Sequence, residues 1–175
     1  MTFHVWRRDI NLYLSLPLLT GIALIQSILF SRVSVRGARP DLMLLVVLIW
    51  AFVRSMDEGV IWGFIGGLII DLLSGGPLGA TAIALVLAAF WTGQPWGQGL
   101  GTNVARLLLL ALLSTATYHL VILIILAWTG HTIDWEFALL RVAGPSVLLN
   151  TILTPFIRQP LAWLSRRIRR EGLNL

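Results

Sequence analysis

Glycine recurs every four residues in one apolar segment of this chain, and that repeat constrains the fold more than any other feature. Gly59, Gly63 and Gly67 are followed at the same interval by Asp71. On a helix this spacing forms one stripe, along which a neighbouring backbone approaches closely while the carboxylate faces protein rather than lipid. Repeated glycine is costly in an ordinary soluble helix. The stripe therefore predicts a closely packed helix in a membrane protein.

The composition points to the same environment. Of the 175 residues, 57% are hydrophobic and 12% are charged, and apolar stretches recur from end to end. All thirteen basic residues are arginine. They lie at the ends of apolar runs, so the net charge of +5 indicates membrane topology and anionic headgroups rather than nucleic acid. The absence of cysteine excludes disulfides and thiolate metal sites.

Six apolar segments predict an all-α integral membrane protein with six transmembrane helices, in a single domain covering residues 1–175. Several of these helices are short and joined by tight hairpins. A segment of about thirteen residues does not cross the roughly 30 Å hydrocarbon core upright. We therefore expect either that such ends are buried against protein or that the bilayer is thinned locally. The approximate ranges are 10–30, 41–53, 58–73, 78–93, 104–128 and 137–157.

Two turns shape the hairpins on either side of the glycine stripe. Pro40 suits the first turn of the second helix, and Asp41 suits the positive end of that helix dipole. Gly75, Pro77 and Gly79 lie between the third and fourth segments and predict a second tight hairpin.

Placing an ionisable side chain inside a membrane segment costs free energy, so each such residue is a candidate functional residue. With the amino terminus in the cytoplasm, Asp71 and Arg141 lie near the outer ends of their helices. We predict that charge-assisted hydrogen bonds link them and pin the third helix to the sixth, with Arg39 or Asp41 nearby. A pair gated by a ligand or a partner is the alternative. Gln26 is expected to make a hydrogen bond between helices.

Residues 158–175 predict an amphipathic basic helix on an anionic membrane surface, with a partner-binding helix as the competing interpretation. Counting arginines places both termini in the cytoplasm, since nine of the thirteen then lie inside. The arginines of the first outer loop, Arg39 among them, form a candidate contact surface. The predicted membrane-surface residues are Arg158, Trp163, Arg166, Arg167, Arg169 and Arg170.

These motifs resemble the MreD family of membrane proteins. The resemblance rests on Arg39-Pro40-Asp41 before an apolar helix, on the glycine-rich run from Gly63 to Gly79 with Asp71 inside it, and on Pro155 before a basic tail. It implies a non-catalytic component of the bacterial cell-elongation complex in the cytoplasmic membrane, without a cofactor. It also implies that the protein binds MreC and helps to couple MreB filaments to RodA and a class B penicillin-binding protein.

Two other function classes stay in view. An enzyme would need a nucleophile beside a base, and His119 with Ser114, Thr115 or Tyr118 comes nearest, although a polar packing face explains that spacing more simply. A small-molecule or lipid-binding transporter subunit is the alternative function, because MreD is similar in size and helix number to the substrate-binding subunits of energy-coupling-factor transporters. A pocket lined by tryptophans would favour it, and the candidates are Trp50, Trp62, Trp91 and Trp128.

Overall fold

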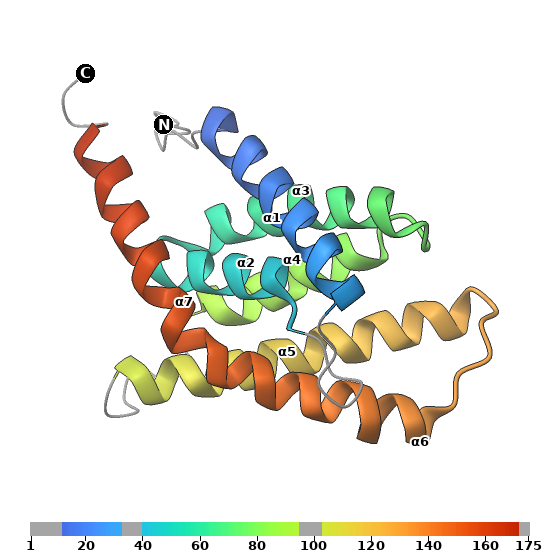
Figure 1. Ribbon diagram of the computed structural model, residues 1–175. Helices are drawn as coiled ribbons and strands as arrows, with labels where there is room; N and C mark the ends of the chain where they lie inside the picture. Colours follow the sequence, from blue (N-terminus) through green and yellow to red (C-terminus); the bar gives the residue numbers. More distant parts are fainter. Residues whose placement is uncertain (1–11, 33–39, 95–102, 172–175) are drawn as a thin grey trace, which may run out of the picture.

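The computed structural model describes residues 12–32, 40–94 and 103–171, and within them the fold is all-helical (Figure 1). The last three elements follow one another without a gap and form one continuous helical stretch, so the described residues contain six such stretches. The elements are α1 (Leu12–Arg32), α2 (Leu42–Val53), α3 (Met56–Ser74), α4 (Ala80–Gly93), α5 (Asn103–Trp128), α6 (Trp135–Phe137), the π-helical turn η1 (Ala138–Ala143) and α7 (Gly144–Glu171).

The two long stretches are apolar enough to cross a membrane by themselves. They run over Val104–Trp128 and Trp135–Arg167, whereas α2 and α4 are shorter apolar helices. The predicted all-helical class is thus confirmed, with long and short apolar helices combined in one chain.

Helix α2 lies at the centre of the molecule. Every residue from Met43 to Ala51 is buried, and α2 contacts α1, α3, α4, α5 and α7. A helix that is apolar all round is stable only when other helices surround it. Protein therefore covers this twelve-residue helix on all sides, so it does not have to match the bilayer thickness.

The last helix does not end where the sequence suggested. We expected a boundary at residue 157, but α7 continues through Pro155 and Pro160 to Glu171. Figure 1 shows that α7 bends part-way along its length, which is the usual effect of proline inside a helix. The basic tail is helical as expected up to residue 171 and forms the end of this helix rather than a separate one.

Candidate functional site

The glycine stripe is where α3 packs against α2 and α4. A Cβ atom on Gly59 would lie 2.8 Å from the Cα of Ala51 in α2. A Cβ atom on Gly63 would lie 3.0 Å from the carbonyl oxygen of Leu85 in α4. Gly67 faces the α4 backbone more closely still, and all three glycines are buried. The stripe therefore serves packing within the molecule.

Asp71 closes the α3–α4 hairpin from its buried position. Its carboxylate accepts hydrogen bonds from the backbone N–H groups of Gly79, Thr81 and Ala82, at 2.8, 3.0 and 3.3 Å. Backbone N–H groups at the start of a helix have no partner within it, and a carboxylate there also complements the helix dipole. Asp71 thus caps α4, although it belongs to α3.

The predicted link between Asp71 and Arg141 is wrong. Arg141 lies in η1 with an exposed side chain, and η1 packs against α5, α6 and α7 rather than α3. The prediction used depth along the helices, which does not fix their lateral order. The carboxylate of Asp71 instead reaches the N–H groups at the next turn, eight to eleven residues along the chain.

The hairpin that Asp71 caps has the expected turn chemistry. Gly75 ends α3 with φ of 67°, and Gly79 precedes α4 with φ of 92°. Residues with side chains rarely adopt this left-handed region. The carbonyl oxygen of Pro77 accepts a hydrogen bond from the Ala80 N–H at 3.2 Å, which completes the turn.

Side chains from three helices accept hydrogen bonds from the backbone N–H groups at the start of α2. Asp41 is the N-cap and accepts a bond from the Leu44 N–H at 3.0 Å, while its own N–H donates to Asn150 Oδ1 in α7 at 3.1 Å. Gln26 Oε1 in α1 accepts from the Met43 N–H at 2.7 Å, which confirms the predicted interhelical role of Gln26. Pro40 precedes the cap, so its predicted place in the first helical turn is wrong by two positions. Arg39 lies outside the described residues.

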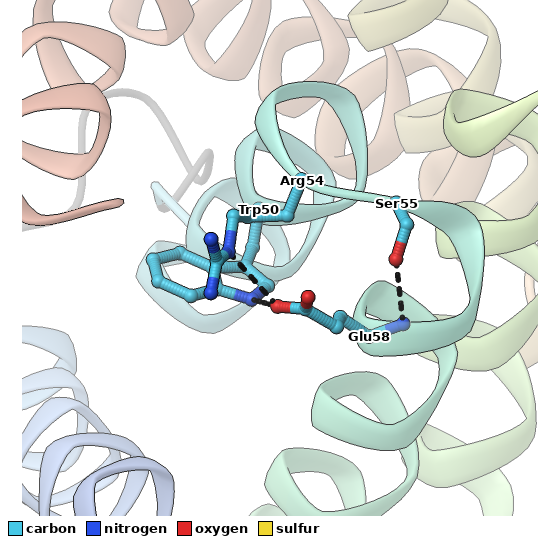
Figure 2. A network of polar contacts seen from close by, with 4 residues as sticks. All are labelled: Trp50, Arg54, Ser55 and Glu58. Carbon is cyan, nitrogen blue, oxygen red and sulfur yellow. Dashed lines mark hydrogen bonds and ion pairs between the residues drawn. The ribbon is translucent and has the colours of Figure 1, made fainter. Parts of the chain in front are cut away.

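A second polar network joins α2 to α3 (Figure 2). Oε2 of Glu58 accepts from Trp50 Nε1 and from Arg54 Nε, both at 3.1 Å, and Ser55 Oγ caps α3 by accepting from the Glu58 N–H at 3.3 Å. Trp50 also stacks on Trp62, with ring centroids 4.0 Å apart. We did not predict this network. The spacing of eight residues between Trp50 and Glu58 across a short turn was the signal available.

Ser114, Thr115 and Tyr118 of α5 are buried, and Ser114 faces α4. Ser114 Oγ lies 2.7 Å from Thr92 Oγ1 of α4 and donates to the Ala88 carbonyl oxygen at 3.2 Å. His119 Nδ1 lies 2.9 Å from the carbonyl oxygen of Thr115 on its own helix. The arrangement is the predicted polar packing face, and Ser114 has a neighbouring hydroxyl rather than a base beside it.

The tryptophans considered for a pocket do not converge. Trp50 and Trp62 stack in the core, whereas Trp128 is 90% exposed at the end of α5. Trp91 is partly buried and makes an edge contact with Phe90, its neighbour in α4.

The distal half of α5 and the start of the last helix form an apolar hairpin with little cover. Figure 1 shows these two segments side by side, below α2, α3 and α4 in that view. In an apolar 18-residue stretch of each long span, only 22% is buried in the molecule. Arg141 is an exposed charge on this surface. Its large exposed hydrophobic side chains are Leu120, Ile124, Trp128, Trp135, Phe137, Leu139, Leu140 and Leu148.

The predicted surface residues of the tail differ in their surroundings. Arg158 is partly buried against the ring of Phe52. Trp163 is 55% exposed, with the guanidinium of Arg167 lying 5.4 Å from its ring centroid, and Arg166 is exposed. The side chains of Arg169 and Arg170 lie outside the described residues.

A family model described as rod shape-determining protein MreD matches residues 7–167. No curated protein and no solved structure matches the chain.

Proposed function

We propose, from the premise that this chain belongs to the MreD family of rod shape-determining membrane proteins, that it binds MreC within the bacterial elongation complex. Through MreC it would help to couple cytoplasmic MreB filaments to RodA and a class B penicillin-binding protein. Membership of the family carries the proposal, because the match spans residues 7–167 and covers all or nearly all of every helix described above. The family is non-catalytic, so the function lies in contacts with other proteins.

The contact surface for MreC is, in this proposal, the exposed hairpin of α5 with η1 and the first half of α7. The glycine stripe is fully used by α2 and α4, so it is not free to receive a partner. The hairpin, in contrast, has wide apolar faces and carries Arg141. An exposed arginine among apolar side chains is costly in lipid. A partner helix that supplies a carboxylate would remove that cost.

Both termini lie in the cytoplasm under this proposal. The arginine distribution favours that orientation. Figure 1 supports it, since the start of α1 and the end of α7 lie on the same side of the molecule.

The test is affinity purification of the detergent-solubilised protein from its own membranes, followed by mass spectrometry. Wild type is compared with Arg141→Gln and with Arg166→Gln, which removes an equal charge from an exposed site on the tail. We expect MreC and the wall synthases with wild type and Arg166→Gln, and loss of MreC with Arg141→Gln.

Two results would contradict the proposal. Retention of MreC by Arg141→Gln at wild-type level would remove the hairpin as its contact surface. Recovery of an ATPase module and its coupling subunit in place of MreC would move the assignment to the transporter alternative. A substitution in the glycine stripe, such as Gly63→Leu, would not test partner binding. The larger side chain would collide with the α4 backbone, so the variant would lose folding before any contact with a partner could be measured.

A further inference from the structure

Phe52, near the end of α2, has two arginines from other helices against its ring. The guanidinium carbon of Arg106, in the first turn of α5, lies 5.4 Å from the ring centroid. That of Arg158, in α7, lies 5.9 Å from the same centroid. Residues more than fifty positions apart in the sequence are thus held together at the junction of α2, α5 and α7.

One hydrogen-bond donor of Arg158 lacks an acceptor among the described residues. Its Nε is buried and has no hydrogen-bond partner among the described residues. In the part of the chain that the structure describes, Arg158 also forms no ion pair, and Oε2 of Glu58 is occupied by Arg54 and Trp50. A buried donor on a charged group is costly unless something accepts its hydrogen bond. The ring of Phe52 attracts the cation but does not supply that acceptor.

Helix lengths place both arginines near headgroup depth in one leaflet. Arg158 follows Trp135 by 23 residues, which corresponds to about 35 Å of helix. Arg106 precedes Trp128 by 22 residues, or about 33 Å. Trp128 and Trp135 are exposed at the opposite ends of the same two helices, where tryptophan marks a membrane interface. Since the hydrocarbon core is roughly 30 Å thick, the arginines reach the other interface.

We propose that Arg158 and Arg106 bind the phosphate of a phospholipid headgroup, with Phe52 forming the apolar side of the site. A guanidinium presents a fork of donors that matches phosphate oxygens, and an anion between two cations offsets their repulsion. Arg106 is already oriented, because its Nη2 donates to the Gln94 carbonyl oxygen at 3.0 Å. The site goes beyond the proposed function and does not depend on MreC. It also differs from a general attraction of the basic tail to the membrane, since its residues come from three helices.

The experiment measures the thermal unfolding midpoint of the whole protein in detergent micelles. Phosphatidylglycerol, diacylglycerol and inorganic phosphate are titrated separately, because a ligand that binds the folded state raises the midpoint. We expect phosphatidylglycerol to raise the midpoint of wild type, while the other two additives do not. In Arg158→Gln the apparent affinity for phosphatidylglycerol should fall about 10- to 100-fold, the usual effect of losing hydrogen bonds to a charged group.

Arg166→Gln is the matched control, because it removes the same charge two turns further along α7 from an exposed position. It should keep the lipid response of wild type. Equal loss of affinity in both variants would reduce the effect to diffuse surface charge and overturn the site. If Arg158→Gln does not fold, the three titrations of the wild-type protein decide whether a phospholipid binds. A rise in midpoint with inorganic phosphate alone, or an equal rise with diacylglycerol, would also overturn the lipid assignment.

Discussion

Replacing Gly67 by alanine tests whether the α3–α4 contact requires glycine. The new Cβ would lie 2.5 Å from the backbone nitrogen of Ala82 and 2.9 Å from the carbonyl carbon of Thr81. The Cα of Ala82 would lie closer still, so reaching ordinary van der Waals distance requires the two helices to separate by about 1 Å or more at this point. The hydrogen bonds that the backbone N–H groups of Thr81 and Ala82 donate to the Asp71 carboxylate resist that movement. We therefore expect an overpacking cost of about 1–3 kcal/mol, toward the upper end of that range.

Gly21→Ala is the control for this prediction. Gly21 is also within a helix, but no atom lies within 4 Å of where its Cβ would be. Both substitutions gain about 1 kcal/mol of helix propensity, so the difference between them isolates the packing cost. At about 2–4 °C per kcal/mol for a chain of this size, Gly67→Ala should unfold about 2–12 °C below Gly21→Ala in the same detergent. Equal midpoints for the two variants would refute the close-contact argument.

Three further substitutions test the polar contacts, each by unfolding in mixed micelles with sodium dodecyl sulfate. Asp71→Asn should cost about 1.5–3 kcal/mol, because an amide oxygen replaces a charged acceptor at the start of α4; an unchanged unfolding curve would count against the cap. Asn150→Leu should cost about 1–3 kcal/mol by leaving the buried Asp41 N–H without its acceptor, and an unfolding curve like that of wild type would show that this bond contributes little stability. Glu58→Leu removes the acceptor shared by Trp50 and Arg54 and should cost about 1–3 kcal/mol, so stability equal to wild type would show that the shared bonds contribute little.

Local patterns in the sequence predicted what lies along each helix, and they could not predict which helices are neighbours. The glycine spacing identified the packed face of α3 because that face depends only on helical periodicity. The Asp71–Arg141 pairing failed because two residues at similar depth can lie on opposite sides of a bundle. The acceptor that Asn150 provides to Asp41 spans 109 positions, and no local pattern indicates such a distant partner. The continuation of α7 beyond residue 157 was missed because the basic tail was expected to form a separate helix on the membrane surface.

The capping of α2 has a consequence for how the protein is made. The Gln26 side chain that meets the Met43 N–H leaves the ribosome before α2, but the Asn150 that meets the Asp41 N–H emerges more than a hundred residues later. A twelve-residue helix enclosed by five others has no stable place in the bilayer before they arrive. The central helix therefore completes its hydrogen bonds only when translation is almost finished. Chains truncated before α7 would keep the Asp41 side chain as the cap of α2, but the buried Asp41 N–H would lack its acceptor.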